Sequence, residues 1–333
     1  MSTNQVQGGS NGHQPARGNG RDVVIETHNL RRRFGKTVAV DGLDLTVYRG
    51  EIFGLVGPDG AGKTTTLRLL AAIMNPDEGS ATVAGFDTRR QSERIKERIG
   101  YMAQSFSLYG DLSIIENINF FADVFGVTGK VRRERIDRLL AFARLDRFRK
   151  RRAGRLSGGM QKKLGLACTL IHEPEILYLD EPTTGVDPVS RREFWDILTN
   201  LHVDGVTIVV CTPYMDEAER CSRVGLMFDG RLIEVGSPEE IKSRVPGQVI
   251  QFLPGDRLRA RDLLRETEGI KEVQTFGELL NIFVEDVDAG REIILKAMQD
   301  AEISVSEMRQ IAPRMEEAFV SLIRRRELDE TAN

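Results

Sequence analysis

Residues 57–65, Gly-Pro-Asp-Gly-Ala-Gly-Lys-Thr-Thr, constrain the fold of this 333-residue chain more than any other stretch. They follow an apolar run at 51–56 and lead into a helical pattern at 67–72, which predicts a strand, a loop and a helix in that order. The loop matches the pattern Gly-x4-Gly-Lys-[Ser/Thr], in which glycines leave room for backbone N–H groups to surround phosphate groups. We therefore expect residues 57–65 to bind a nucleoside triphosphate.

The individual loop residues have expected roles in this binding. The predicted contacts to the nucleotide come from Gly57, Pro58, Asp59, Gly60, Ala61, Gly62, Lys63, Thr64 and Thr65. Lys63 would lie along the β- and γ-phosphates, and the Thr64 hydroxyl would bind Mg²⁺. The following helix presents its positive end to the same phosphates. A glycine turn that merely links a strand to a helix is the alternative, and the full match of the pattern disfavours it.

A second apolar run, residues 176–179, ends in the carboxylates Asp180 and Glu181. Downstream of a phosphate-binding loop, this arrangement favours Asp180 as a Mg²⁺ ligand through water. Glu181 would then orient or deprotonate an attacking water molecule. The alternative interpretation is that the two carboxylates cap the next helix.

The stretch 156–160, Leu-Ser-Gly-Gly-Met, precedes a helix that we expect at residues 161–172. Ser157 suits the N-cap position, and the paired glycines Gly158 and Gly159 leave N–H groups exposed that suit an anion. Taken alone the pentapeptide is a weak signal, because Ser-Gly-Gly opens many helices.

Two further features admit more than one interpretation. Phe34 lies just before the nucleotide strand and could stack on adenine, although a single Phe is usually a core residue. Residues 130–155 carry many arginines and lysines against few acids, which is typical of a solvated face, with anionic lipid headgroups as one possible neighbour. Specific binding of nucleic acid is the less favoured explanation of this basic run.

The composition excludes several classes of protein. The net charge is −3 and the pI is near 6.0, so no excess of positive charge points to a nucleic-acid partner. No apolar stretch reaches the roughly 18 residues of a membrane span, and the N-terminus lacks a hydrophobic signal core. The three cysteines, at positions 168, 211 and 221, lack metal-type spacing and are expected to be reduced core residues. We expect a cytosolic protein.

In combination, residues 23–245 resemble the nucleotide-binding subunit of ATP-binding cassette (ABC) transporters. The stretch 156–160 is similar to the family signature, and Gln104 matches the glutamine loop, which in that family ligates Mg²⁺ and reports the nucleotide state. Residues 185–187, ending in Asp187, resemble the loop at the dimer seam. Phe34 occupies the place of the adenine-stacking aromatic, which favours stacking.

The resemblance implies an α/β fold: a P-loop NTPase core of the ABC ATPase type with an antiparallel β subdomain and a helical insertion at about 105–165. It also implies that two subunits enclose two ATP molecules, each between the phosphate loop of one and the Ser157, Gly158 and Gly159 of the other. The cofactors would be ATP and Mg²⁺. The expected partners are an integral membrane permease, received around residues 112–126, and a second ABC ATPase, either a copy of this chain or a different subunit. The protein would then lie on the cytoplasmic face of the membrane.

The overall pattern resembles bacterial multidrug-export ATPases, so export of drugs or other small molecules is the favoured function. Two alternatives remain open. The chain could be a soluble ABC ATPase that acts on ribosomes or nucleic acid, although those proteins usually carry two cassettes or long insertions. It could also be a weakly hydrolysing or idle partner in a heterodimeric ATPase.

Two positions depart from the family pattern. Asp59 stands where Asn is usual, which places an additional carboxylate near the phosphates. Pro213 stands where the family has its switch histidine, and proline has neither an imidazole nor a backbone N–H to donate to the γ-phosphate. We therefore hypothesise slow hydrolysis at this chain's own loop, or hydrolysis that depends on Glu181 alone.

Three domains are expected along the chain. Residues 1–20 form a glycine-rich disordered tail, residues 21–246 form the nucleotide-binding domain, and residues 247–333 form an accessory domain. The accessory region predicts β-α-β-β-α-β followed by a helix, which fits a small ferredoxin-like α+β domain. It contains no catalytic constellation, so a regulatory or dimerising role is inferred only by analogy.

Overall fold

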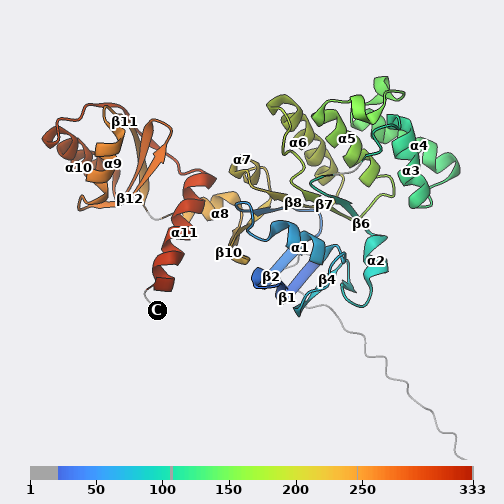
Figure 1. Cartoon of the computed structure of the whole chain (residues 1–333). Coiled ribbons are helices and arrows are strands. Elements are labelled where there is room, and N and C mark those ends of the chain that lie inside the picture. The colour runs from blue at the N-terminus through green and yellow to red at the C-terminus, as the bar shows by residue number, and fades with distance from the viewer. Residues whose placement is uncertain (1–21, 106–107, 246, 332–333) are drawn as a thin grey trace, which may run out of the picture.

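A six-stranded sheet forms the centre of the molecule, with strand order β10-β9-β3-β8-β7-β6 (Figure 1). The computed structural model describes residues 22–105, 108–245 and 247–331, so the tail expected at 1–20 lies outside the described residues. The strands of the sheet are β3 (Ile52–Val56), β6 (Ile99–Met102), β7 (Ile176–Asp180), β8 (Thr207–Thr212), β9 (Arg223–Phe228) and β10 (Arg231–Gly236). All neighbours are parallel except β9 and β10, so β3, β6, β7 and β8 all end at the same edge.

The two faces of this sheet bury different side chains. Along β7, Leu177 and Leu179 pack toward the helical side of the molecule, whereas Ile176 and Tyr178 pack toward a second sheet. This alternation is the period of two that a strand imposes on its side chains. Because both faces are covered, the central strands β3, β7 and β8 are buried along their whole length and are mostly apolar, as expected for a buried parallel sheet.

The second sheet is antiparallel and four-stranded, with order β2-β1-β4-β5. Its strands are β1 (Val23–Phe34), β2 (Thr37–Tyr48), β4 (Glu78–Val83) and β5 (Phe86–Asp87). Both β1 and β2 contain polar residues, and shifts of register in their pairing let each strand continue past them. At one shift of register the Thr27 side chain bonds to the backbone of β2: its buried hydroxyl donates to the Leu43 carbonyl (2.8 Å) and accepts from the Leu45 N–H (2.8 Å).

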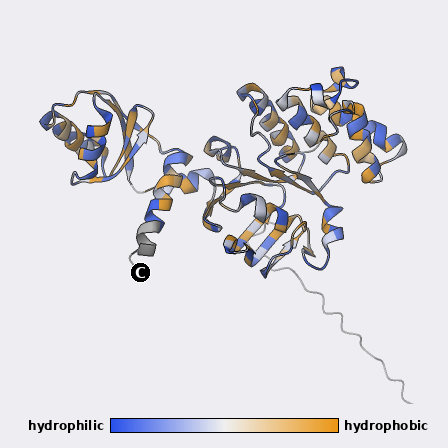
Figure 2. Cartoon of the chain, in the orientation of Figure 1, coloured by the Kyte–Doolittle hydropathy of each residue, from blue (hydrophilic) through white to orange (hydrophobic). Residues whose placement is uncertain are grey.

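The helices divide into those that follow the central strands and those of the predicted insertion. The first group comprises α1 (Lys63–Leu70), α6 (Pro188–Val203), α7 (Met215–Ala218) and α8 (Pro238–Ser243), while α2 (Ser92–Lys96) connects the second sheet to β6. The insertion comprises α3 (Ile114–Val124), α4 (Gly129–Phe142), the short 3₁₀ turns η1 (Asp146–Phe148) and η2 (Ala153–Arg155), and α5 (Gly158–Thr169). Figure 2 shows both hydrophobic and hydrophilic residues along its helices; α3 and α4 each bury one stripe, whereas α5 is buried along most of its length.

Two helices of the insertion begin with a serine N-cap. Helix α3 begins with a capping box: the Ser113 side chain accepts from the Glu116 N–H, and the Glu116 side chain accepts from the Ser113 N–H. Helix α5 begins at Gly158, three positions before the expected start at residue 161, because Ser157 is its N-cap and accepts from the Met160 N–H (3.4 Å). The two glycines of the signature therefore lie in the first turn of the helix.

The C-terminal segment follows the predicted order of elements. They are β11 (Gln248–Pro254), α9 (Arg257–Arg265), β12 (Ile270–Phe276), β13 (Leu279–Val284), α10 (Val287–Asp300), β14 (Val305–Ile311) and α11 (Met315–Thr331). The sheet is antiparallel with order β12-β13-β11-β14, a pairing consistent with the expected ferredoxin-like arrangement.

Helix α11 connects this segment to the rest of the molecule. Met315 and Ala318 pack in the same hydrophobic cluster as Ile241 of α8, and α11 also contacts α7. At the start of α11, the buried Glu317 accepts from Asn281 Nδ2 of β13 (2.9 Å) and from the Arg314 N–H (2.8 Å). The last helix thus packs on the nucleotide-binding part while its first turn is hydrogen-bonded to the C-terminal sheet.

Candidate active site

The loop after β3 requires glycine at defined positions. Gly60 and Gly62 have φ of +81° and +101°, in the left-handed region that favours glycine. A Cβ on Gly62 would lie 2.1 Å from the Ala39 carbonyl oxygen, and one on Gly57 would lie 2.0 Å from the Met227 carbonyl oxygen. Both clashes are with backbone atoms, which cannot move away as a flexible side chain could. The loop can therefore adopt this conformation only with glycine at positions 57 and 62.

Lys63, the first residue of α1, is buried beneath this loop. Its ammonium group donates to the carbonyl oxygens of Gly57 (2.8 Å) and Pro58 (2.8 Å). A full positive charge is therefore held inside the turn, where the start of α1 adds further N–H donors. This arrangement fits a triphosphate, as the sequence pattern predicts.

The carboxylate at the end of β7 lies beside the first turn of α1. The Thr64 hydroxyl donates to Asp180 Oδ1 at 2.8 Å, and the Tyr101 hydroxyl of β6 lies 3.5 Å from Asp180 Oδ2. Burial, and then the Asp180 charge, raise the pKa of Tyr101 to about 12, so its hydroxyl remains a neutral donor. The structure thus brings together Thr64 and Asp180, two of the three predicted Mg²⁺ ligands.

The third predicted ligand, Gln104, contacts the second carboxylate. Gln104 Nε2 donates to Glu181 Oε2 at 2.8 Å, and the Thr184 hydroxyl donates to the same oxygen at 3.2 Å. Among the described residues, no three His, Cys, Asp or Glu side chains form a metal-binding group. An oxygen site of one carboxylate, one hydroxyl and one amide suits Mg²⁺, which takes its remaining ligands from water and phosphates.

The backbone at Glu181 is held in an unusual conformation. Its φ is +47°, in the left-handed region, and its N–H donates to the Cys211 carbonyl of β8 at 2.9 Å. A carboxylate residue in this region costs free energy that the surrounding structure must supply. Such positions cluster at active sites, which supports the functional interpretation of Glu181 over a helix-capping role.

Lys162 is a site residue that the sequence analysis missed. It lies in α5, and its ammonium group donates to the Gln104 carbonyl oxygen at 2.8 Å. Burial lowers the pKa of Lys162, while the charges of Glu181 and Asp180 act in the opposite direction. A lysine one helical turn after Gly158 gives no sequence signal for this role, because its target is a backbone atom of a distant segment.

The signature residues and Asp187 occupy neighbouring helix starts. A Cβ on Gly159 would lie 2.4 Å from Ser190 Cβ, so glycine is what lets α5 and α6 approach closely. Asp187 is the N-cap of α6 and accepts from the Val189 N–H (3.1 Å) and the Ser190 N–H (2.9 Å), and the Ser190 hydrogen bond lowers its pKa. Within the described residues no hydrogen bond joins Ser157, Gly158 or Gly159 to the phosphate loop, so their contact with nucleotide remains a prediction.

Phe34, the predicted adenine contact, is at the end of β1. Its side chain is 45% exposed, and the Arg32 guanidinium lies 5.0 Å from the centre of its ring. The adjoining strand β2 brings Ala39 against Gly62 of the phosphate loop. An exposed aromatic at this hairpin is compatible with stacking, and its role in binding remains a prediction.

The segment after β8 carries Pro213, and the structure adds a residue that the sequence analysis left without a role. The fully buried Glu217 of α7 accepts through Oε1 from the Thr183 hydroxyl (2.5 Å) and from Arg191 Nε (2.6 Å). This connection ties the segment after Pro213 to the loop that follows Glu181 and to helix α6. Among the described residues, the histidines at 28, 172 and 202 form no hydrogen bond to a residue of this site.

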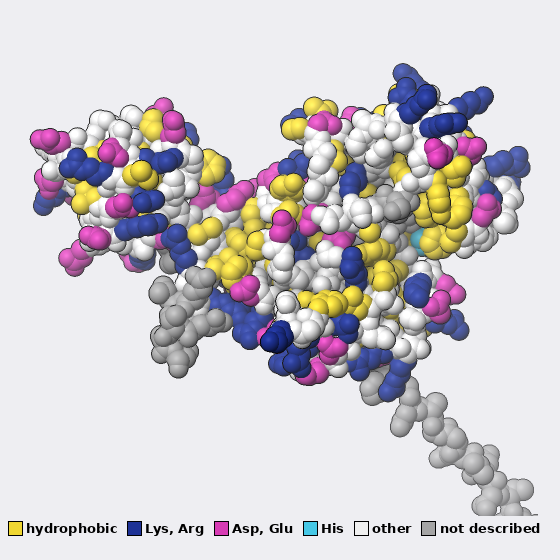
Figure 3. Space-filling model, in the orientation of Figure 1, with side chains coloured by type: hydrophobic (Ala, Val, Ile, Leu, Met, Phe, Trp, Pro, Cys, Tyr) yellow, Lys and Arg dark blue, Asp and Glu magenta, His cyan; other side chains and the backbone are white. Residues whose placement is uncertain are grey.

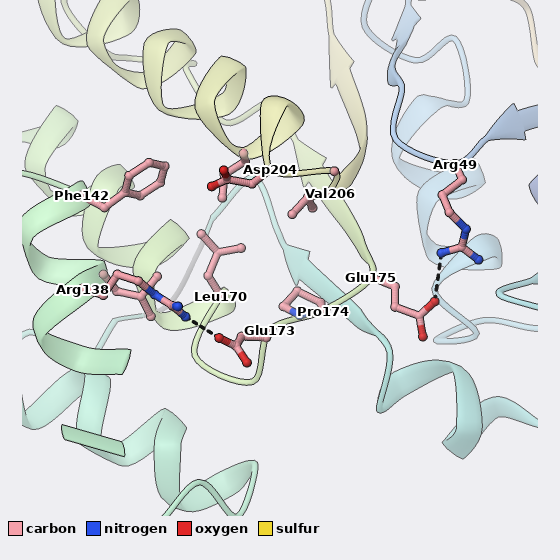
Figure 4. A pocket seen from close by; sticks show the side chains of 12 residues that line it. Arg49, Arg138, Phe142, Leu170, Glu173, Pro174, Glu175, Asp204 and Val206 are labelled. Carbon is pink, nitrogen blue, oxygen red and sulfur yellow. Dashed lines mark hydrogen bonds and ion pairs between the residues drawn. The ribbon is translucent and has the colours of Figure 1, made fainter. Parts of the chain in front are cut away.

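A hollow of about 620 Å³ lies at the opposite edge of the central sheet (Figure 4). Glu175 and Val206, which line it, come immediately before β7 and β8, whereas the phosphate loop follows the end of β3. Figure 4 shows Arg138 directed at Glu173 and Arg49 directed at Glu175 on its two sides. Ligands of parallel α/β sheets bind at the carboxyl ends of the strands, so this hollow is separate from the predicted nucleotide site.

Comparison with known proteins agrees with this geometry. Residues 40–184 match the family described as ABC transporter. The Nod factor export ATP-binding protein I of Cupriavidus pinatubonensis is 39% identical over 268 residues, which cover 79% of this chain and 81% of that protein. The chain belongs to the ABC transporter ATP-binding family.

Other relatives of this ABC chain extend the comparison. The probable multidrug ABC transporter ATP-binding protein YbhF of Escherichia coli is 42% identical over 310 residues, covering 91% of this chain and 52% of that protein. The chain thus spans about half the length of that relative. The structure of cbiO1 from Clostridium perfringens matches with a TM-score of 0.62 at 27% identity, over 67% of this chain and 92% of that one. The dimeric post-hydrolysis structure of the cassette MJ0796, bound to ADP and Pi, matches with a TM-score of 0.58 at 26% identity, over 64% of this chain and 98% of that one.

Replacing Lys162 tests whether it positions Gln104. Lys162→Met removes the hydrogen bond to the Gln104 backbone, so we expect the ATPase rate to fall by roughly tenfold or more while ATP binding is kept. Because the pKa of Lys162 is lowered, the lysine loses its charge at a lower pH than an arginine would. In Lys162→Arg, the fall of the ATPase rate at alkaline pH should therefore move to higher pH. Lys130→Met, an exposed position on α4, is the control. Unchanged rates and pH profiles in both Lys162 variants would contradict this role.

Proposed function

We propose that this chain is the ATP-binding and ATP-hydrolysing subunit that powers a separate membrane permease, which exports drugs or other small molecules. The observation that carries the proposal is the convergence of Thr64 with Asp180 and of Gln104 with Glu181 beside the phosphate loop. The relatives include a probable multidrug ABC transporter ATP-binding protein and a Nod factor export ATP-binding protein, and their names support transport and export.

The residues of the site have distinct roles in this proposal. Lys63 and the N–H groups of the glycine loop bind the β- and γ-phosphates, and the Phe34 ring stacks on adenine. Thr64, Asp180 and Gln104 hold Mg²⁺, which when bound neutralises phosphate charge. Glu181, held by Gln104 and Thr184, orients and deprotonates the attacking water.

Hydrolysis further requires a second ATPase subunit. The N-cap Ser157 and the glycines at 158 and 159 provide N–H groups at the start of α5. We propose that these groups contact the γ-phosphate bound by the partner subunit. A solved dimeric cassette among the structural relatives supports such pairing. The partner is either a second copy of this chain or another ABC ATPase.

The permease is proposed to dock on an exposed apolar surface formed by α3 and the segment just before it. Tyr109, Phe120 and Val124, which we call the docking patch, are 49%, 39% and 62% exposed. The rings of Tyr109 and Phe120 pack edge to face with centroids 4.7 Å apart. Exposed aromatic clusters of this kind are enriched at protein interfaces. Tyr109 is four residues after the last described residue of the Gln104 segment, so the docking patch adjoins the active site along the chain.

A peripheral position on the cytoplasmic face of the membrane follows from this partnership. Over residues 22–105, 108–245 and 247–331, no helix has both the length and the apolar character needed to cross a bilayer. Attachment to the membrane is therefore proposed to occur through the permease.

Replacing the proposed general base tests the function. Glu181→Gln keeps the shape and the hydrogen bond from Thr184 but removes the base, so we expect the ATPase rate to fall by roughly a hundredfold or more. ATP binding should remain within a few-fold of wild type. The matched control is Glu239→Gln, an exposed carboxylate of α8, and turnover is measured by phosphate release. If Glu181→Gln hydrolyses ATP as fast as wild type, this site is idle and the proposal fails.

A second substitution tests the effect of Pro213. Pro213→His supplies an imidazole donor beside the γ-phosphate position, so we expect the ATPase rate to rise by roughly tenfold. Pro213→Ala restores the backbone N–H alone and separates the contribution of the imidazole. No gain with histidine, either alone or with permease and partner ATPase present, would count against slow hydrolysis as a consequence of Pro213.

A further inference from the structure

The segment that precedes the signature carries a surface of unpaired positive charge. Residues 147–155 contain no acidic residue. The side chains of Arg147, Lys150, Arg151, Arg152 and Arg155 are exposed and form no ion pair with any acid in the described part of the chain, and we call them the basic ledge. The remaining basic residue, Arg149, is neutralised by Asp137 (2.6 Å) and Asp146 (3.0 Å).

The basic ledge has a fixed place beside the docking patch. Its backbone pairs with the start of α3: the Ile114 N–H donates to the Arg151 carbonyl (3.0 Å), and the Ala153 N–H donates to the Leu112 carbonyl (2.8 Å). Figure 3 shows Lys and Arg side chains gathered at the outer end of this helical part, next to a hydrophobic cluster. The charges are therefore presented by a hydrogen-bonded segment rather than by an unanchored loop.

Few acids oppose this charge. On the paired segment, Glu116 is engaged by Ser113 in the capping box, and the nearby Arg152 charge contributes to its lowered pKa. Asp111 is the other exposed acid of that segment. Because the whole chain carries a net charge of −3, the basic ledge is a local reversal of sign, and such a patch orients a protein on a surface of opposite charge.

We propose that the basic ledge binds the anionic headgroups of the membrane that contains the permease. This inference rests on the proposed function, because a permease docked on Tyr109 and Phe120 places the neighbouring surface toward the bilayer. Anionic lipid attracts basic side chains within about a Debye length of the surface, which is ~8–10 Å at physiological salt. The ledge thus supplies a second contact that holds the ATPase at the membrane and sets its orientation. Nucleic acid, the other polyanion, is disfavoured by the acidic character of the chain as a whole.

Vesicles without any permease test the basic ledge alone. The full chain is sedimented with vesicles of equal parts phosphatidylcholine and phosphatidylglycerol, and with vesicles of phosphatidylcholine only. We expect binding only to the anionic vesicles, with loss of binding as salt is raised. Each basic side chain removed should lower the binding constant by roughly fivefold at low salt, so Arg147→Gln/Lys150→Gln/Arg152→Gln should bind about a hundredfold more weakly.

A matched variant controls for the change of net charge. Arg259, Arg265 and Lys296 are exposed on α9 and α10 and form no ion pair with a described acid, and their triple replacement by Gln should bind vesicles as wild type does. Thermal unfolding and ATPase rate, measured without lipid, should be unchanged in both variants. Equal loss in both variants, equal binding to the two kinds of vesicle, or binding of duplex DNA in preference to anionic vesicles would overturn the proposal. If instead Glu181→Gln hydrolysed ATP as fast as wild type, the proposed function would be rejected, while the vesicle result would still report separately on lipid binding by the basic ledge.

Discussion

The hydrogen bond from Thr64 to Asp180 joins the two segments on which the rest of the site depends. It forms because β3 and β7 are parallel members of one sheet and end at the same edge, so the loop after β3 and the carboxylate ending β7 must meet. The buried Lys63 supplies the positive charge, and Asp180 supplies the negative charge that would hold a metal ion beside the phosphates. Nucleotide binding is therefore a property of the sheet topology as much as of the loop.

The helical insertion reaches this edge through Gln104. Its side chain contacts Glu181 and its carbonyl accepts from Lys162, so one residue is in contact with both the proposed general base and the signature helix. The proposed docking patch adjoins Gln104 along the chain, so we propose that a permease bound there would displace Gln104 when it moves. On the other side, Glu217 ties the segment after Pro213 to Thr183 and Arg191, and α11 packs on the same short helix, α7. The C-terminal segment thus contacts α7, the helix that follows Pro213.

Much of the site could be predicted from sequence because its chemistry is local. The phosphate loop and the Asp180–Glu181 pair each lie in one continuous stretch beside an apolar strand, and the structure places Thr64, Asp180, Gln104 and Glu181 together. Lys162 and Glu217 could not be found in this way, because their partners are a backbone oxygen and a half-buried arginine that lie far from them in the sequence. The length of β1 and β2 likewise has no local sequence signal, since the buried Thr27 that bridges a shift of register looks like an ordinary polar interruption in the sequence.

Calorimetric titration of the full-length protein with ATP, with and without Mg²⁺, tests the central claim most directly. Wild type should bind ATP more tightly when Mg²⁺ is present. Asp180→Asn should still bind ATP but gain nothing from Mg²⁺, because the metal-holding carboxylate is gone while the loop is intact. Lys63→Ala should lose binding under both conditions. ATP binding that persists in Lys63→Ala, or an undiminished effect of Mg²⁺ in Asp180→Asn, would contradict the account.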